Sequence, residues 1–361
     1  MVPRREFIRA TFGVATAAAL GAVCGPTTAV PPASQRRYRI GYLTGRVAEC
    51  VTEPRDWQVA NGVAIRAGRP SIPLPDACAE GPVVRALEER GYRLGENLEW
   101  ITVSPAKIGP ATQPDLVPPA AAVVALEVDV IIAQASNAAF AAKEATATIP
   151  IVVNSAADVV EAGLVASLAR PGGNITGVST RVLETGLKRV EVLREAFPRV
   201  KSPILVYGIQ PSNLLAIGPG VESARKLGLS PVAIQLTDEP GFLLKARRAL
   251  DDGADSLVVF APLAGPGPAT VLAFVREHRL PAVFIGLEYH DQGAVSFYAS
   301  TDDFPSKVAE YVDRILNGAN PGDLPIVGPT TWELVVNLKV ADALGTKIAS
   351  SVVARATRIV K

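Results

Sequence analysis

The stretch from residue 148 to residue 180 constrains the fold more than any other part of the chain. Residues 149–153 form a short apolar run after a breaker, which predicts a fully buried strand of a parallel sheet. Small residues follow at 154–157, at the end of the strand where open α/β sheets bind their ligands. Asp158 and Glu161 have the spacing of a helix capping box, and Arg170-Pro-Gly-Gly would end that helix before an extended segment at 174–179. The stretch therefore predicts one complete βα unit of a doubly wound sheet.

The same alternation of apolar runs and amphipathic segments continues along the whole chain. Expected strands are residues 38–43, 98–103, 128–133, 149–153, 203–207, 232–236, 256–260, 282–285 and 294–299. Expected helices are residues 81–90, 116–126, 136–146, 183–197, 218–227, 240–251, 269–278 and 303–316, with a final helix within 331–344. Strands that alternate with helices favour parallel sheets, and the low aromatic share of 6% argues against an all-β sandwich.

The length and the order of these elements predict two α/β lobes. About 330 residues remain after the N-terminal segment described below, which is long for a single core. Extended crossings near 177–180, 297–301 and 326–330 would join two doubly wound, Rossmann-like lobes around a cleft. We expect lobe 1 to comprise residues 38–178 plus 301–326, and lobe 2 residues 179–298 plus 330–361.

Residues 1–29 have the layout of a cleaved export signal. Arg4-Arg5-Glu6-Phe7 is a basic start of the twin-arginine type, and a weakly apolar run then leads to a small-residue cleavage site at 27–29. The run is too short and too polar to span a bilayer, and a disordered or interfacial helix is the alternative. Cys24 could carry a lipid, but the residues before it fit a lipobox poorly. We therefore expect soluble export to the periplasm.

The charge balance does not indicate a nucleic-acid partner. The whole chain has a net charge of +1, and residues 1–29 contain three Arg and one Glu, which leaves −1 for the rest. A near-neutral chain has no electrostatic footprint for nucleic acid or an anionic membrane. With two His and no CxxC spacing, neither a metal site nor a cofactor is expected.

A Pro- and Gly-rich stretch at 46–82 interrupts the pattern after the first expected strand, where a helix would normally begin. Cys50 and Cys78 lie near its two ends. In an oxidising compartment they would form a disulfide that contributes about 2–4 kcal/mol if it is unstrained. Two free thiols in a variable insertion are the alternative, because the sequence does not show their Cα separation.

Several stretches resemble one family, in order, along nearly the whole chain after residue 29. They are Arg39-Ile-Gly-Tyr-Leu, Arg90-Gly-Tyr-Arg-Leu-Gly, Val128-Asp-Val-Ile-Ile-Ala, Gly163-Leu-Val-Ala-Ser-Leu-Ala-Arg-Pro-Gly-Gly-Asn and Trp332-Glu-Leu-Val-Val-Asn-Leu-Lys. In these the chain is similar to the periplasmic substrate-binding components of ABC transporters of the tryptophan/tyrosine-type group. That resemblance implies a type I periplasmic-binding fold, a non-enzymatic receptor for a small-molecule ligand, and an ABC permease in the inner membrane as partner.

The chain departs from the family pattern close to the expected ligand loop. Asp158-Val-Val stands where the family usually has Asp-Pro-Val, and Glu161 stands where a glycine is common. These changes concern specificity rather than fold. An amino acid or an aromatic carboxylate is the leading expectation for the ligand, and the receptor is expected to be a monomer. A periplasmic receptor that senses its ligand for a signalling partner is the alternative.

The candidate ligand contacts lie at the carboxyl ends of expected strands in both lobes. They are Tyr42, Thr44, Ser136, Asn137, Asn154, Ser155 and Asp158 in lobe 1, and Tyr207, Phe260, Glu288 and Tyr298 in lobe 2. Ser136 is equally a candidate cap for the helix that ends near residue 146, whose free N–H groups suit an anion. Packing is the alternative for Phe260 and the tyrosines. Residues 170–174 are expected to be structural and far from the cleft.

Glu288, His290 and Asp291 form the densest titratable cluster and are the basis of a less favoured hydrolytic-enzyme hypothesis. Their spacing matches no nucleophile, metal or phosphate motif, and neither a GxSxG nor a Walker sequence occurs. A polar loop over the cleft explains the cluster better, so no catalytic residue is assigned.

Overall fold

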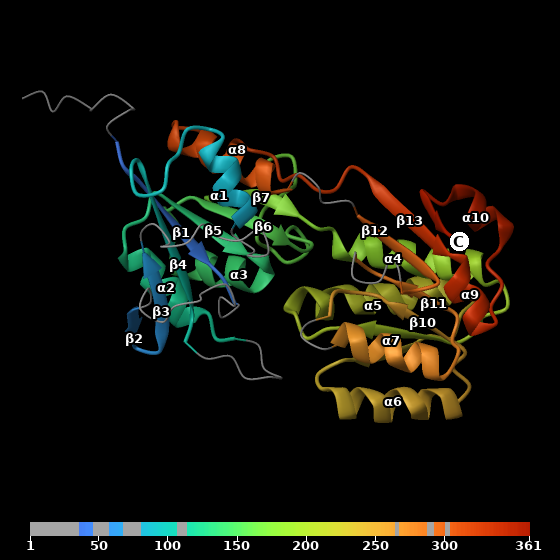
Figure 1. The fold of residues 1–361 in the computed structure, drawn as a ribbon. Helices are drawn as coiled ribbons and strands as arrows, with labels where there is room; N and C mark the ends of the chain where they lie inside the picture. The colour runs from blue at the N-terminus through green and yellow to red at the C-terminus, as the bar shows by residue number, and fades with distance from the viewer. Residues whose placement is uncertain are drawn as a thin grey trace, which may run out of the picture. The chain divides into compact units, whose positions relative to one another are not determined.

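Two seven-stranded sheets organise the chain in the computed structural model, which describes residues 36–45, 58–67, 81–106, 114–263, 267–286, 292–299 and 304–361. The first sheet has the strand order β2-β3-β4-β1-β5-β6-β7, and the second has the order β14-β13-β12-β11-β10-β8-β9 (Figure 1). Antiparallel pairing joins β2 to β3, β3 to β4 and β12 to β13, and the other named pairs are parallel. Two lobes of α/β type result, as the sequence predicts.

The first lobe is built around the first sheet. Its strands are β1 (Tyr38–Leu43), β2 (Gln58–Ala60), β3 (Val63–Ala67), β4 (Leu98–Pro105), β5 (Val130–Gln134), β6 (Ile151–Ala156) and β7 (Ile175–Ser179). Its helices are α1 (Gly81–Glu88), α2 (Val117–Ala125), α3 (Ala135–Ala145) and α8 (Phe304–Leu316), followed by the short 3-10 helix η3 (Pro321–Asp323). Helices α1 and α8 share one hydrophobic core with one face of the sheet, and α2 and α3 share another with the opposite face.

The second lobe repeats this layering. Its strands are β8 (Pro203–Tyr207), β9 (Val232–Gln235), β10 (Ser256–Val259), β11 (Ala282–Phe284), β12 (Val295–Ala299), β13 (Trp332–Asn337) and β14 (Arg358–Val360). Its helices are α4 (Val182–Ala196), α5 (Pro211–Lys226), α6 (Glu239–Asp251), α7 (Gly267–Glu277), α9 (Leu338–Leu344) and α10 (Ser350–Arg355). Helices α4, α5 and α10 cover one face of the sheet, and α6, α7 and α9 cover the other.

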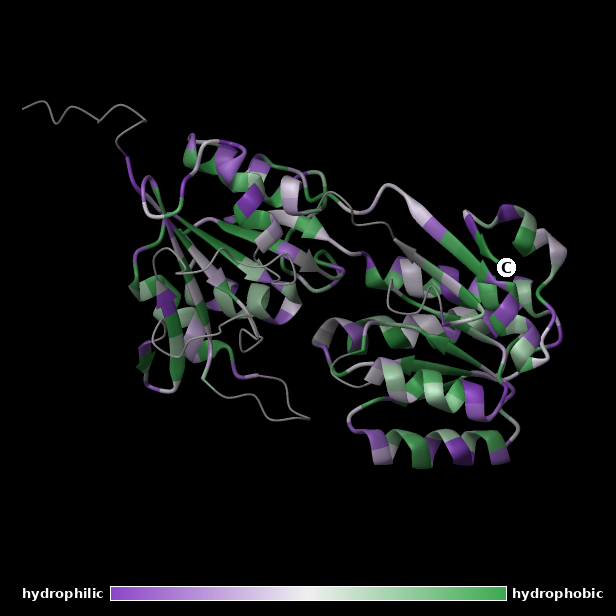
Figure 2. Ribbon diagram, viewed as in Figure 1, coloured by the Kyte–Doolittle hydropathy of each residue, from purple (hydrophilic) through white to green (hydrophobic). Residues whose placement is uncertain are grey.

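Burial of both faces explains why the strands are continuously apolar. In β5, Val130 and Ile132 belong to the core under α1 and α8, while Ile131 and Ala133 belong to the core over α2 and α3. Successive side chains of a strand point to opposite faces, so a parallel strand with helices on both sides must be apolar at every position. Figure 2 shows the strands coloured mainly as hydrophobic, with hydrophilic residues mainly on helices and loops.

A β-hairpin lies inside the stretch that the sequence marks only as an insertion. Strands β2 and β3 are joined by Asn61 and Gly62, with φ of 51° and 80°. Two consecutive positive φ values characterise the type I′ turn, which Asn-Gly favours more than any other pair. The local signal was therefore present, and the many prolines around it concealed it.

The helix expected after Asp158 is absent, which corrects the capping-box interpretation. Residues 157–174 form turns and bends between β6 and β7. A single turn closes where the Ala162 N–H donates to the Asp158 carbonyl, and Gly163 follows with φ of 68°. The Asp158 carboxylate caps a different helix, as described below, so the expected reason for a helix here does not exist.

The helix expected within 331–344 is present, but it occupies only the second half of that range. Residues 332–337 form strand β13, and a helix, α9, begins at Leu338. β13 pairs with β12 on one side and with β14 on the other, and β14 was not expected. Trp332, Val335 and Val336 are residues that strands favour, and pairing with β12 and β14 holds the segment in the sheet.

Two of the predicted crossing segments run side by side. The Ser179 N–H donates to the Val327 carbonyl at 2.7 Å, and the Val327 N–H donates to the Gly177 carbonyl at 3.1 Å. The crossing expected at 297–301 extends beyond the described residues. None of the helices within the described ranges combines the length and apolar character needed to cross a membrane.

Candidate functional site

Three polar side chains meet where β1, β5 and β6 end at the carboxyl edge of the first sheet. The Tyr42 hydroxyl donates to Gln134 Oε1 at 2.7 Å, and Asn154 Nδ2 donates to the same oxygen at 2.8 Å. The Tyr42 ring stacks on Trp100 with centroids 5.4 Å apart. Two of the three, Tyr42 and Asn154, are predicted ligand residues, and both are buried. Gln134 was missed, although its position as the last strand residue before a helix is a recognisable signal.

Ser136 and Asn137 lie in the first turn of α3, which begins at Ala135. Ser136 therefore does not cap this helix, which corrects one of its two predicted roles. Its hydroxyl instead accepts a hydrogen bond from the Ala157 N–H at 2.9 Å and joins the end of β6 to α3. The residue at the cap position, Gln134, makes no side-chain cap hydrogen bond. The first turn of α3 thus retains N–H groups of the kind that bind carboxylates.

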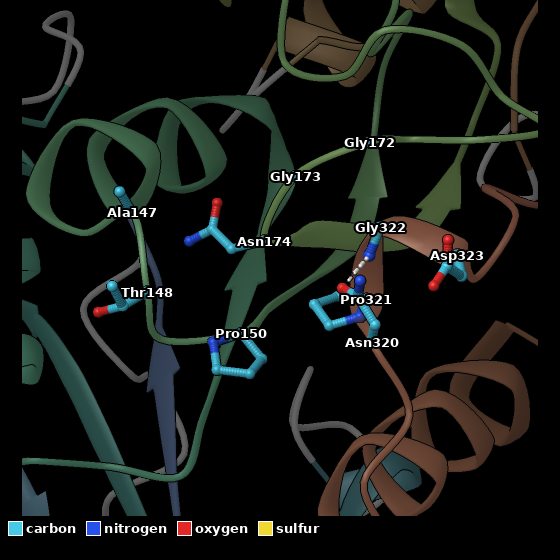
Figure 3. A pocket seen from close by; sticks show the side chains of 10 residues that line it. All are labelled: Ala147, Thr148, Pro150, Gly172, Gly173, Asn174, Asn320, Pro321, Gly322 and Asp323. Carbon is cyan, nitrogen blue, oxygen red and sulfur yellow. Dashed lines mark hydrogen bonds between the residues drawn. The ribbon is translucent and has the colours of Figure 1, made fainter.

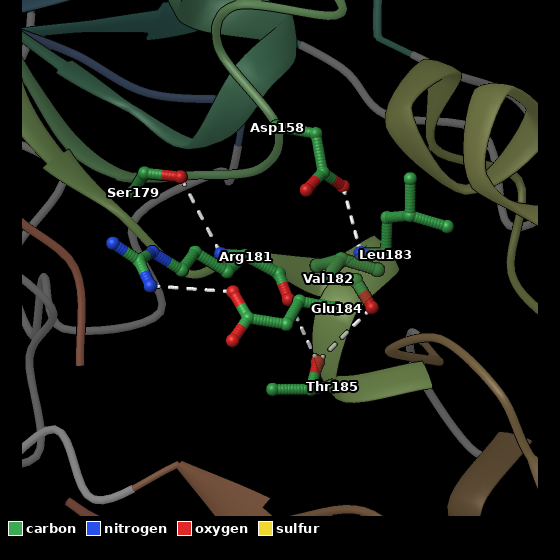
Figure 4. A network of polar contacts seen from close by, with 7 residues as sticks. All are labelled: Asp158, Ser179, Arg181, Val182, Leu183, Glu184 and Thr185. Carbon is green, nitrogen blue, oxygen red and sulfur yellow. Dashed lines mark hydrogen bonds and ion pairs between the residues drawn. The ribbon is translucent and has the colours of Figure 1, made fainter. Parts of the chain in front are cut away.

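Asp158 caps helix α4 from the loop after β6 (Figure 4). Its Oδ2 accepts a hydrogen bond from the Leu183 N–H at 2.9 Å. Burial raises the pKa of Asp158 from 3.8 to about 6; the Leu183 hydrogen bond opposes this shift, and the charges of Glu161 and Glu184 add to it. A buried carboxylate that lies near two further carboxylates would be stabilised by a cationic group of a ligand.

Arg181 precedes α4 and pairs with Glu184 rather than projecting alone into solvent. Its Nη1 lies 3.2 Å from Glu184 Oε2. The Thr185 hydroxyl lies 2.9 and 3.0 Å from the carbonyl oxygens of Arg181 and Val182 and shares its one proton between them (Figure 4). These contacts organise the start of α4 around Asp158.

Backbone strain gathers in the three loops at this edge. Ala135, Asp158 and Arg181 have φ of 64°, 43° and 47°. They follow β5, β6 and β7 respectively. Each residue with a side chain in this conformation costs of order 1–3 kcal/mol, and such strain is found preferentially at binding and catalytic sites. The carboxyl edge of the first sheet is therefore the candidate functional site.

In the second lobe the Phe260 ring is enclosed between α4 and α5. A Cβ atom at Gly186 or Gly220 would lie 2.6 or 2.5 Å from the ring. The ring is fully buried, so packing, one of the two roles that the sequence left open, accounts for it. Tyr207 is half-buried at the end of β8 and stays a predicted ligand contact.

Arg189 of α4 completes the carboxyl edge of the second sheet. Strand β11 ends at Phe284, level with the last residue of β10 but three positions before the last residue of β12. Arg189 Nη2 donates to the Phe260 carbonyl at 2.5 Å, and Nη1 donates to the Phe297 carbonyl at 3.3 Å. Burial lowers the pKa of Arg189 to about 9, and no described acidic side chain forms an ion pair with it. The guanidinium satisfies two backbone carbonyls, that of Phe260 just after β10 and that of Phe297 in β12.

Gln210 occupies the position before α5 that Gln134 occupies before α3. Its Oε1 is buried and accepts no hydrogen bond within the described part of the chain. A buried acceptor without a donor requires an explanation, and a donor group of a ligand is one. Gln210, like Gln134, was not recognised from the sequence.

A surface pocket of about 450 Å³ lies at the opposite, amino edge of the first sheet (Figure 3). It is lined by Ala147, Thr148, Pro150, Gly172, Gly173, Asn174, Asn320, Pro321, Gly322 and Asp323. Asn174 Nδ2 donates to the carbonyls of Thr146 and Ile149, and Gly322 packs directly on the backbone of Gly173. These contacts hold the loops before β6 and β7 together, so residues 172–174 have a structural role here.

Comparison with known proteins identifies the class of receptor to which this geometry belongs. A family model described as "ABC transporter substrate binding protein" matches residues 75–360. The chain belongs to this family. The resemblance stated from the sequence is thereby confirmed.

Individual relatives agree with this substrate-binding protein in fold and length. The tyrosine-binding protein of Clostridioides difficile (strain R20291) is 26% identical over 268 residues, which are 72% of this chain and 74% of that protein. A conserved domain protein from Vibrio cholerae is 26% identical, with a TM-score of 0.67, over 90% of this chain and 99% of that one. The ABC domain from Streptococcus pneumonia in complex with L-Trp is 22% identical, with a TM-score of 0.67, over 89% and 100%. The type I periplasmic-binding fold is confirmed by matches of this extent.

Several predicted residues of the substrate-binding protein lie outside the described residues. Glu288, His290 and Asp291 are among them, as are Cys50 and Cys78. Only the backbone of Ser155 and Tyr298 is described, in β6 and β12. Their predicted roles in ligand binding, and the predicted disulfide, stay predictions.

Proposed function

We propose that the chain is exported to the periplasm, binds an amino acid or a related aromatic carboxylate in the cleft between its lobes, and delivers it to an ABC permease in the inner membrane. Membership in the substrate-binding family supports the receptor and transport parts of this proposal. The tyrosine-binding relative and the L-Trp complex support the ligand class. The receptor acts without catalysis and without a cofactor, and it works as a monomer.

The observation that carries the ligand class is the chemistry beside the end of β6. Asp158 supplies a buried carboxylate whose pKa is raised chiefly by burial, and a cationic ligand group beside it would favour its charged form. The first turn of α3 supplies uncapped N–H groups and is bonded to Ala157, the residue next to Asp158. An acceptor for an ammonium group and donors for a carboxylate therefore lie in adjacent segments, which suits a zwitterionic amino acid.

A thermal-shift screen of residues 30–361 against the amino acids and simple aromatic acids tests this proposal. We expect a rise in melting temperature with at least one amino acid, because a ligand that binds only the folded state stabilises it. Asp158→Asn should abolish most of the shift by removing the negative charge that faces the ammonium group. Asp342→Asn, which changes an exposed residue of α9, should leave the shift intact. Absence of a shift with every amino acid would contradict the proposed ligand class.

A further inference from the structure

The carboxamide of Gln134 is held through its oxygen. This oxygen receives two hydrogen bonds, from the Tyr42 hydroxyl at 2.7 Å and from Asn154 Nδ2 at 2.8 Å. A carbonyl oxygen has two lone pairs, so these two donors use its full accepting capacity. In this arrangement the oxygen faces inward and the amide nitrogen faces away from Tyr42 and Asn154.

The other end of the same amide is a donor without a partner in the described part of the chain. Gln134 is half-buried, and both of its side-chain hydrogen bonds within that part of the chain involve Oε1. Part of this residue is accessible at the edge of the sheet. A pre-oriented N–H donor is thus available at the edge of the sheet.

Strand register shows that this donor lies at the boundary between core and edge. Gln134 pairs with Asn154 across β5 and β6, and Tyr42 pairs with Ile132, two residues earlier in β5. The three side chains therefore share the face of the sheet that α1 and α8 cover. Tyr42 is fully buried and stacks on Trp100, which gives the network a rigid base. Gln134 is the member of the network that projects beyond this base.

We propose that Gln134 is a specificity-determining residue, whose Nε2 donates a hydrogen bond to the carboxylate of the ligand. This inference rests on the proposed function, since it assigns a partner to one group of the proposed amino acid. Membership in the family does not by itself imply this contact. The contact requires that the ligand place a hydrogen-bond acceptor beside Gln134 Nε2. A hydrogen bond to a charged acceptor commonly contributes about tenfold to a hundredfold in affinity.

The variant Gln134→Glu separates this role from a structural one. Glutamate has the same shape, and one of its oxygens still accepts from Tyr42 and Asn154. Its second oxygen replaces the donor by a negative acceptor, which repels a ligand carboxylate. Calorimetric titration with L-tyrosine and L-tryptophan, and with their carboxamides, gives the readout. We expect the Kd of the acids to rise at least a hundredfold, while the Kd of the amides changes less than about fivefold.

Two further variants keep the test interpretable. Gln58→Glu adds the same charge at an exposed position of β2 and should leave the acid-to-amide preference unchanged. Gln134→Met removes the donor without adding a charge. If Gln134→Glu fails to fold, the methionine variant should weaken acid binding about tenfold or more and amide binding less.

The possible results distinguish this inference from the proposed function. If the wild type binds an amino acid and folded Gln134→Glu binds the acids with unchanged Kd, the inference about Gln134 is overturned but the proposed function is not. An equal loss of acid and amide binding also overturns it, because a purely structural defect has that effect. A wild-type receptor that binds neither L-tyrosine, L-tryptophan nor any other amino acid overturns the proposed function and this inference together.

Discussion

Replacing Asp158 with asparagine should stabilise the ligand-free receptor at neutral pH. The side chain is 9% exposed, and burial is the largest of the influences that raise its pKa from 3.8 to about 6. Each pKa unit corresponds to 1.36 kcal/mol, so the shift of about two units represents about 3 kcal/mol. Asparagine removes the buried charge, and its oxygen can still accept the hydrogen bond from the Leu183 N–H.

The sign of the pH dependence follows from the direction of this shift. The folded state holds the Asp158 proton more tightly than the unfolded chain does, because the folded-state pKa is the higher one. The stability contributed by this carboxyl is fully present below about pH 4 and is lost as the pH rises through about 6. The raised pKa already includes the opposing hydrogen bond from Leu183, so we expect Asp158→Asn to gain about 3 kcal/mol at pH 7.5 and about 1 kcal/mol at pH 4.5.

Urea denaturation followed by circular dichroism, at several pH values from 4.5 to 8, measures this difference. Asp342→Asn is the matched control, because it changes an exposed aspartate of α9 and should give no gain that grows with pH. A variant at Asp158 that is no more stable than the wild type at pH 7.5 would refute the reasoning. So would a gain of equal size at all pH values, because it would not come from titration of this group.

Two further predictions concern packing and the cysteines. Gly220→Ala should lower the free energy of unfolding by about 1–3 kcal/mol, because the new Cβ would lie 2.5 Å from the Phe260 ring. Gly218→Ala in the same helix has open space and should raise the free energy of unfolding by up to about 1 kcal/mol in the same denaturation assay. Equal effects of the two substitutions would contradict this packing. Titration of denatured, unreduced protein with a thiol reagent should detect neither Cys50 nor Cys78, and two reactive thiols would disprove the predicted disulfide.

Much of the fold was predictable because its signals are local. Continuous apolar runs such as residues 130–133 identify strands that are buried on both faces, and the breakers between them identify the loops. The errors occur where a local pattern was overruled from a distance. Residues 332–337 form a strand because β12 and β14 provide pairing partners, and residues 158–168 form no helix because Asp158 is used elsewhere.

The candidate site was predictable in position but only partly in chemistry. The sequence places Tyr42, Asn154 and Asp158 at strand ends, and the first two share a network in the structure. It does not distinguish Gln134 from other polar residues after strands, because its importance depends on two donors that are 92 and 20 residues away in sequence. The same limit applies to Arg189, whose partners, the Phe260 and Phe297 carbonyls, are 71 and 108 residues away in sequence.

The sequence by itself determined the two-lobed α/β architecture and the edge at which ligand groups gather, because hydrophobic period and turn residues act within a few positions of the chain. The tertiary structure decided which groups meet at that edge. Asp158 caps α4 rather than a helix of its own, and Gln134 turns its oxygen inward and its nitrogen outward, because hydrogen-bond partners are chosen by proximity in space. The chemistry available to a ligand therefore arises from pairings between strands that the local pattern does not encode.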